Sequence, residues 1–104
     1  LVLTGCGTSG RVAHLTARRY NRLLRTSSFD YLISGGDAAL VLSDELPEDD
    51  PAAGAAELAN LTRERSATAV ALVGISCGLS APYVAGQLDL ALAPNEGDTA
   101  PMFV

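Results

Sequence analysis

The chain contains no lysine and no tryptophan, and it has only two cysteines and a single histidine, His14. Without lysine it has neither a P-loop lysine nor a Schiff-base nucleophile. Cys6 and Cys77 lie far apart in the sequence, and neither has a histidine or a second cysteine at the spacing of metal ligands. We therefore expect no metal site and no cofactor, and we do not expect a structural disulfide.

Positive charge is also scarce. All seven basic residues are arginine, against twelve acidic residues, and the formal net charge is −5. Five of the arginines lie between Arg11 and Arg25, so the rest of the chain is strongly acidic. An acidic surface repels nucleic acid, and no apolar run reaches the roughly 18 residues needed to cross a bilayer. The sequence thus predicts neither a nucleic-acid nor a membrane partner.

The order of the hydrophobic segments indicates the fold class. Hydrophobic residues make up 48% of the 104-residue chain, which is enough for the core of one domain. Strands are predicted at residues 1–4, 29–33, 69–75 and 102–104. Helices are predicted from just after Gly10 to about residue 25, at 51–65 and at 81–92, with a short helical turn at 38–43. This alternation predicts an α/β fold in which a parallel sheet lies between two layers of helices.

Both ends of the sequence fall in strand-like runs. We therefore expect residues 1–104 to form a partial domain, incomplete at both ends, that is a fragment of a longer protein.

Three loops rich in glycine and serine follow the first three predicted strands, at residues 5–10, 34–37 and 76–80. Parallel sheets bind ligands at the carboxyl ends of their strands, so these loops should open on one edge. Hydroxyl groups of Thr8, Ser9, Ser76 and Ser80 would there join the N–H groups that begin two helices. Such donors suit a phosphate monoester and need no lysine.

A dinucleotide site is the alternative for the first loop, because residues 5–10 match the pattern G-x-G-x-x-G. That site needs an acid about 20 residues further on to hold the ribose. Asp30 lies at the start of its predicted strand and Asp37 follows two glycines in a loop, so neither is well placed. The sequence favours the phosphate monoester.

Five acidic residues gather in the segment 44–50. Asp50 precedes Pro51 and is predicted to cap the second helix, and Asp49 is expected to be solvated. Glu45 and Glu48 are the candidates for contact with sugar hydroxyls, because a carboxylate accepts two hydrogen bonds. His14 and the cysteines are more simply interpreted as packing or loop residues.

Three motifs together resemble a known family. They are Gly-Thr-Ser-Gly-Arg at 7–11, Tyr-Leu-Ile-Ser-Gly-Gly-Asp at 31–37, and Gly-Ile-Ser-Cys-Gly-Leu-Ser-Ala-Pro-Tyr-Val-Ala-Gly-Gln at 74–87. In order and spacing, over nearly the whole chain, they resemble the first sugar isomerase (SIS) domain of the glucokinase regulatory proteins. The resemblance implies a three-layer α/β/α SIS-type fold with a five-stranded parallel sheet, of which this chain would hold the first three βα units.

The resemblance also implies a ligand and its site. The ligand would be fructose 6-phosphate or fructose 1-phosphate. Thr8 and Ser9 would hold the phosphate, Ser76, Cys77 and Gly78 would close on it, and Glu48 and Glu45 would contact the sugar. The complete set of ligand-binding residues expected from the motifs is Gly7, Thr8, Ser9, Glu45, Glu48, Ser76, Cys77, Gly78 and Ser80.

The function implied by this family is regulatory. Its members are not enzymes, so no catalytic residue is expected; they bind and inhibit glucokinase, with fructose 6-phosphate promoting and fructose 1-phosphate opposing the complex. The implied location is intracellular, in the cytoplasm and nucleus.

Two alternatives stay open. The related N-acetylmuramic acid 6-phosphate etherases share Pro-Tyr-Val at 82–84, and they eliminate lactate from an amino-sugar phosphate with two carboxyl groups. Glu48 matches the base of that family, but Arg18 stands at the position of the other carboxylate and cannot donate a proton at neutral pH. The second alternative is a sugar-phosphate sensor attached to another module, such as a transcriptional regulator, although no DNA-binding segment is visible.

Overall fold

The computed structural model describes residues 1–42, 46–94 and 100–104. Four strands form one parallel sheet in the order β2-β1-β3-β4, which confirms the predicted fold class. The strands are β1 (Val2–Gly5), β2 (Asp30–Ile33), β3 (Val70–Ile75) and β4 (Met102–Phe103). The helices are α1 (Gly7–Leu24), α2 (Pro51–Glu64) and α3 (Pro82–Leu92), with short 3-10 helices η1 (Asp37–Leu40) and η2 (Leu46–Asp49).

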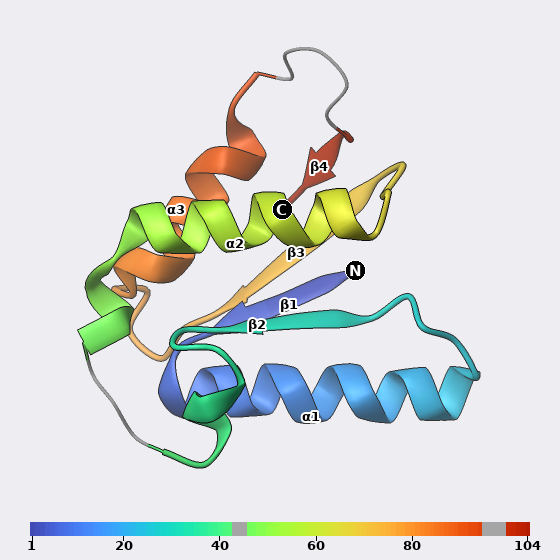
Figure 1. Cartoon of the computed structure of the whole chain (residues 1–104), viewed down its shortest axis with the longest axis horizontal. Coiled ribbons are helices and arrows are strands. Elements are labelled where there is room, and N and C mark those ends of the chain that lie inside the picture. The colour runs from blue at the N-terminus through green and yellow to red at the C-terminus, as the bar shows by residue number, and fades with distance from the viewer. Residues whose placement is uncertain (43–45, 95–99) are drawn as a thin grey trace.

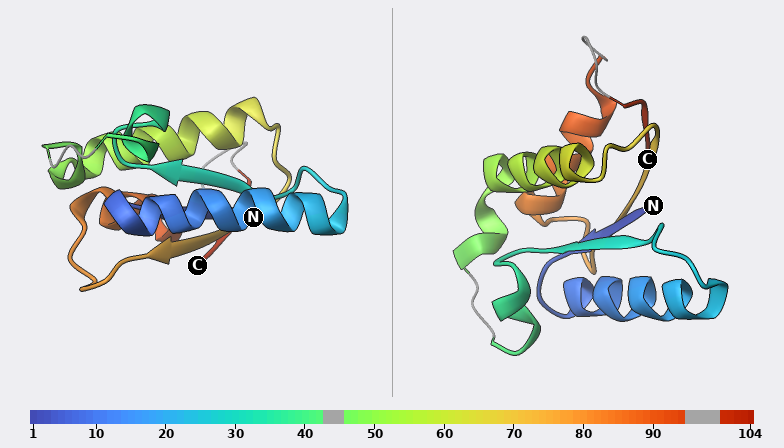
Figure 2. Two further views of the ribbon diagram at one scale, coloured as in Figure 1. Left: turned by 90° about the horizontal axis from the view of Figure 1, so that it is seen from below. Right: turned by 45° about the vertical axis from the view of Figure 1, so that its right-hand side comes forward.

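The helices form two layers on the sheet. Helix α1 lies against one face, and α2 and α3 lie against the other (Figures 1 and 2). Side chains that alternate along β1 supply both cores: Val2 packs with Leu58 and Leu72, whereas Leu3 packs with Ala13 and other residues of α1. The predicted sandwich of a parallel sheet between helices is therefore what the described residues form.

The register brings the three strand ends to one level. Gly5 of β1 is opposite Ile33 of β2 and Ile75 of β3. The chain leaves all three strands at the same edge of the sheet, so the three predicted glycine- and serine-rich segments begin side by side. This edge is where parallel sheets bind ligands.

Helix α1 begins one turn earlier than predicted. The expected start after Gly10 is wrong, because the glycines serve the packing of the helix and not a loop. Gly7 has a positive φ of 51°, and a Cβ at Gly10 would lie 2.4 Å from Cγ1 of Ile33. Glycine lets the first turn of α1 press against β2, so Thr8 and Ser9 belong to that first turn.

Helices α2 and α3 cross with their backbones in contact. A Cβ at Gly54 would lie 2.0 Å from the carbonyl oxygen of Tyr83, and one at Gly86 would lie 1.9 Å from that of Pro51. The buried Tyr83 hydroxyl donates to Glu57, which joins the two helices again. Within the described residues, no helix has the length and apolar character needed to span a membrane.

Candidate functional site

A cavity of about 340 Å³ lies at the carboxyl edge of the sheet. Its walls come from the start of α1, the residue after β2, the segment around η1, η2 and the residues after β3. The lining residues are Cys6, Gly7, Thr8, Ser9, Arg11, Ser34, Ala39, Leu42, Glu48 and Cys77. A volume of this size lies at the lower end of the range of about 300–1,000 Å³ for small-molecule sites.

Five residues expected from the sequence line this cavity: Gly7, Thr8, Ser9, Glu48 and Cys77. Three others, Ser76, Gly78 and Ser80, lie in the β3–α3 segment but do not line it. Gly78 and Ser80 are exposed, and Leu79 between them has 92% of its surface exposed. The backbone at Leu79 has a positive φ of 54°. Glu45 lies outside the described residues.

The N-terminus of α1 opens onto the cavity without a cap. The first N–H groups of an α-helix have no acceptor within the helix, and the N-cap residue of α1, Cys6, makes no side-chain capping hydrogen bond. Helix α2 shows the contrast, because Oδ1 of Asp50 accepts from the N–H of Ala53 at 2.9 Å, as predicted for this cap. The first turn of α1 thus has donors available, together with the exposed hydroxyl of Thr8 and the half-buried hydroxyl of Ser9.

Glu48 of η2 reaches this end of α1. Its Oε1 lies 3.2 Å from the position that a Cβ at Gly7 would occupy. The carboxylate therefore faces the positive end of the helix dipole, which stabilises its charge. Among the described lining residues Glu48 is the one carboxylate and Arg11 the one cation, whereas the whole chain carries a net charge of −5.

The thiol of Cys6 is held in its neutral form. Burial raises the pKa of Cys6 to about 11; the charge of Glu48 and, less strongly, that of Asp49 add to this effect, whereas the hydroxyl of Ser34 opposes it. A thiol with this pKa is a poor nucleophile at neutral pH. Cys6 and Cys77 are both free, as expected, and both line the cavity.

Sequence reasoning missed two polar residues of the cavity, Arg11 and Ser34. Arg11 lies one helical turn after Gly7, so the spacing i, i+4 from the glycine motif could have indicated it. Its guanidinium donates to the carbonyl of Leu42 at 3.4 Å, which brings η1 against α1. Ser34 is the first residue after β2, and its place at a strand end was the available signal.

Other candidates lie elsewhere. His14 packs edge-to-face on Tyr31, with ring centroids 4.5 Å apart, and lines a different cavity together with the exposed Arg18. Asp30 pairs with Arg65 at the start of β2, and Asp37 accepts from the hydroxyl of Tyr31 at 2.7 Å. Since both acids already have partners away from the cavity, the dinucleotide alternative lacks its ribose ligand.

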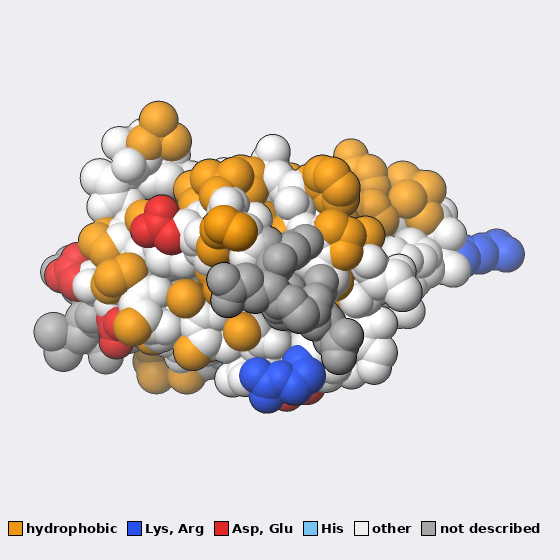
Figure 3. Space-filling view, turned by 90° about the horizontal axis from the view of Figure 1, so that it is seen from above, with side chains coloured by type: hydrophobic (Ala, Val, Ile, Leu, Met, Phe, Trp, Pro, Cys, Tyr) orange, Lys and Arg blue, Asp and Glu red, His pale blue; other side chains and the backbone are white. Residues whose placement is uncertain are grey.

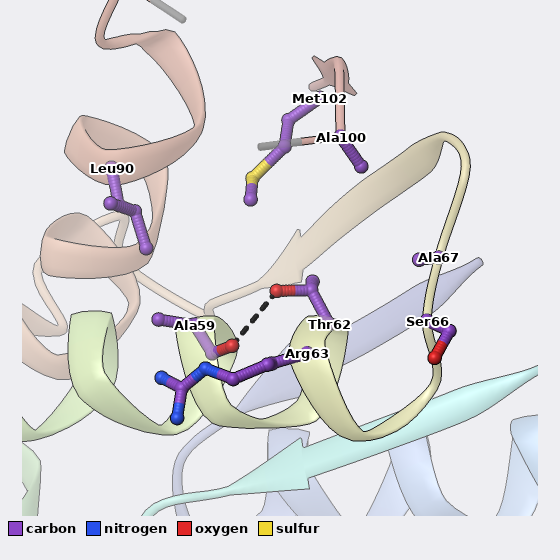
Figure 4. A pocket seen from close by; sticks show the side chains of 8 residues that line it. All are labelled: Ala59, Thr62, Arg63, Ser66, Ala67, Leu90, Ala100 and Met102. Atoms are coloured by element: carbon purple, nitrogen blue, oxygen red, sulfur yellow. Dashed lines mark hydrogen bonds between the residues drawn. The ribbon is translucent and has the colours of Figure 1, made fainter. Parts of the chain in front are cut away.

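A second cavity, of about 440 Å³, lies near the start of β3 between α2, α3 and β4 (Figure 4). Its lining is mostly small and apolar. Thr62 donates to the carbonyl of Ala59, and one guanidinium N–H of Arg63 donates to Asn60. Hydrophobic side chains are also common on the molecular face on this side (Figure 3). Among the described residues, no group of three His, Cys, Asp or Glu could hold a metal ion.

Comparison with known proteins gives relatives of two kinds, regulatory proteins and enzymes. Residues 1–92 match the family described as glucokinase regulatory protein N-terminal SIS domain. The chain is 48% identical over 96 residues to a glucokinase regulatory protein of Xenopus laevis, which covers 88% of this chain and 15% of that protein. It is 43% identical over 93 residues to the glucokinase regulatory protein of Homo sapiens, covering 86% and 15%.

An enzyme family is also similar. The chain is 49% identical over 90 residues to an N-acetylmuramic acid 6-phosphate etherase of Gloeobacter violaceus, covering 85% of this chain and 28% of the etherase. The chain thus spans less than a third of each relative.

Proposed function

Because this chain belongs to the family of the glucokinase regulatory protein N-terminal SIS domain, we propose that it binds a phosphorylated sugar in the cavity at the carboxyl edge of the sheet. We propose fructose 6-phosphate or fructose 1-phosphate as that sugar, and a regulatory role without catalysis. The observation that carries the proposal is the uncapped start of α1, which opens onto a cavity lined by hydroxyl groups.

The phosphate binds at the first turn of α1. Free N–H groups there and the hydroxyls of Thr8 and Ser9 supply donors, and the helix dipole favours negative charge at this end. Arg11 adds a positive charge on the same wall of the cavity. These groups compensate for the missing lysine and for the overall negative charge of the chain.

The sugar binds toward Glu48. Its carboxylate accepts hydrogen bonds from ring or chain hydroxyls. A carboxylate beside a phosphate costs free energy through like-charge repulsion, so Glu48 discriminates in favour of ligands that place a hydroxyl near it. Cys77 closes the cavity from the end of β3. Three of the expected residues contact the ligand only if the β3–α3 segment moves toward the cavity: Ser76, Gly78 and Ser80.

The similarity to regulatory proteins supports a partner as well. We propose that the whole protein inhibits glucokinase in a manner that depends on the bound sugar phosphate, and that it acts in the cytoplasm and nucleus. The similarity rests on relatives of which this chain spans 15%.

Etherase activity is the second candidate, because the etherase of Gloeobacter violaceus is as similar in sequence as the regulatory proteins are. Elimination of lactate needs a general base and a general acid. Glu48 is the one carboxylate that the described lining residues supply, and Arg18 lies outside the cavity. We therefore expect no release of lactate when N-acetylmuramic acid 6-phosphate is incubated with the full chain; measurable turnover would favour the enzyme.

The binding proposal is tested by calorimetric titration of the full chain with fructose 6-phosphate and fructose 1-phosphate. The double variant Thr8→Ala, Ser9→Ala loses two hydrogen bonds to a charged phosphate, so its affinity should fall by about tenfold or more. Ser27→Ala, which removes an exposed hydroxyl that does not line the cavity, is the matched control and should bind as the unmodified chain does. Equal affinity of the double variant would contradict the assignment of the phosphate to α1.

A further inference from the structure

Ser34 is a buried hydroxyl residue of the cavity that neither the motifs nor the family comparison assigns. Its exposed fraction is 3%. Its backbone N–H donates to the carbonyl of Gly5 at 3.2 Å, which continues the pairing of β2 with β1 for one more residue and fixes the backbone at the cavity wall. The position of Ser34 is therefore set by the sheet and not by a mobile loop.

The hydroxyl of Ser34 is not satisfied within the described residues. Its Oγ is buried and has no partner at hydrogen-bond length. Its polar neighbour is the thiol of Cys6, whose pKa it lowers by hydrogen bonding, but a thiol is a weak hydrogen-bonding group. A buried hydroxyl without a good partner destabilises the folded state. Alanine would avoid this cost at the same position.

Two further buried side chains lack partners, which allows a comparison. Thr4 and Gln87 are both 0% exposed, and their side-chain polar atoms have no hydrogen-bond partner among the described residues. Neither lines the cavity. Ser34 is thus the buried, unsatisfied hydroxyl that also faces a ligand-sized space.

We propose that Ser34 is a ligand-binding residue that reads the sugar half of the phosphorylated sugar: a rotation about χ1 turns its Oγ into the cavity, where it exchanges a hydrogen bond with a sugar hydroxyl. Serine has three staggered χ1 wells, so the rotation needs no backbone movement. This inference rests on the proposed function and adds a residue that decides which ligand binds.

The surroundings of Ser34 favour the sugar over the phosphate. The phosphate donors are at the first turn of α1, whereas Ser34 comes from the end of β2. Its neighbour Cys6 is uncharged and lies within the field of Glu48. The proposed function places the sugar toward Glu48, and Cys6 is affected by both Glu48 and Ser34, so Ser34 is assigned to the sugar half of the ligand.

Two variants of the full chain separate ligand binding from folding. Ser34→Ala and Thr4→Val each delete one buried, unsatisfied hydroxyl, so both should keep or raise the midpoint of thermal unfolding. Ser34→Ala should weaken fructose 6-phosphate or fructose 1-phosphate binding about fivefold, the factor that corresponds to one hydrogen bond of about 1 kcal/mol. Thr4→Val should bind these sugars as the unmodified chain does, and inorganic phosphate should bind equally to all three proteins.

Each of the other possible results would contradict a specific part of the proposal. If the unmodified chain binds neither fructose phosphate, both the proposed function and the role of Ser34 are wrong. If the unmodified chain binds and Ser34→Ala binds equally well, only the role of Ser34 is wrong. A parallel loss of inorganic phosphate binding would place Ser34 at the phosphate instead. A lowered unfolding midpoint in Ser34→Ala would show that the hydroxyl is a structural group.

Discussion

At the scale of single residues, Glu48 and Cys6 show how the cavity combines a charged acceptor with a neutral thiol. The carboxylate lies beside the first turn of α1, and its charge contributes to the raised pKa of the thiol. Burial of Cys6 contributes more than Glu48 does, and Asp49 contributes least. The thiol therefore reports on the electrostatics of the cavity.

Glu48→Gln should lower the pKa of Cys6 from about 11, because one of the two largest causes of the shift is removed, and it should stay above the ordinary thiol value of 9.0 because burial remains. The measurement is the rate of alkylation against pH in a Cys77→Ser background, which leaves Cys6 as the one thiol. Asp49→Asn is the control and should lower the pKa less. An unchanged pKa in Glu48→Gln, or a larger change in Asp49→Asn, would contradict this electrostatic assignment.

At the same scale, the sequence predicted part of the cavity. A run of glycine and hydroxyl residues that follows a buried strand lies at the carboxyl edge of a parallel sheet. This rule was enough to predict Gly7, Thr8 and Ser9. Ser34 and Arg11 had only the weaker signals of a strand end and of the i, i+4 spacing from Gly7. Their importance depends on burial, on hydrogen-bond satisfaction and on the contact of α1 with Leu42. Ser80 does not line the cavity, and the sequence does not reveal the positive φ at the neighbouring Leu79.

At the scale of helices and strands, the crossing of α2 over α3 depends on glycine. The contact distances at Gly54 and Gly86 leave no room for a Cβ against the carbonyls of the facing helix. Backbone atoms of a helix cannot move aside as a side-chain end can. The two helices therefore fix Tyr83 and the start of α3 behind the cavity.

Gly54→Ala should destabilise the protein by about 1–3 kcal/mol, since it forces α2 and α3 apart. Gly78→Ala is the matched control, because a Cβ there would meet only Oγ of Ser80 at 3.4 Å and Gly78 has no positive φ. Its effect should stay within about 0.5 kcal/mol. Urea unfolding of both variants measures this difference. Equal free energies of unfolding for Gly54→Ala and the unmodified chain would show that the crossing can relax.

Element boundaries were predictable where a local signal exists. Pro51 after the capping Asp50 fixed the start of α2, and Pro82 fixed the start of α3 within one residue. The start of α1 was misjudged, because glycine in sequence indicates a loop whereas here Gly10 permits close packing on Ile33. Helix η2 was not predicted, since a 3-10 turn has no periodicity of its own to detect.

At the scale of the whole molecule, the level ends of β1, β2 and β3 are the feature from which the function follows. The parallel register gathers residues from five segments of the chain around one cavity. The chain carries a net charge of −5, and among the described lining residues Arg11 and Glu48 carry opposite charges. The proposed anion site therefore depends on specific donors at α1 and not on overall charge.

The central claim is that a phosphorylated sugar binds at the first turn of α1. The most direct test is to follow backbone amide chemical shifts of the full chain by NMR during titration with fructose 6-phosphate. The account predicts saturable shifts at Gly7, Thr8 and Ser9, while Ala59, Thr62 and Ala67 of the second cavity stay unchanged. Shifts confined to the second cavity, or no shift at any ligand concentration, would contradict the account.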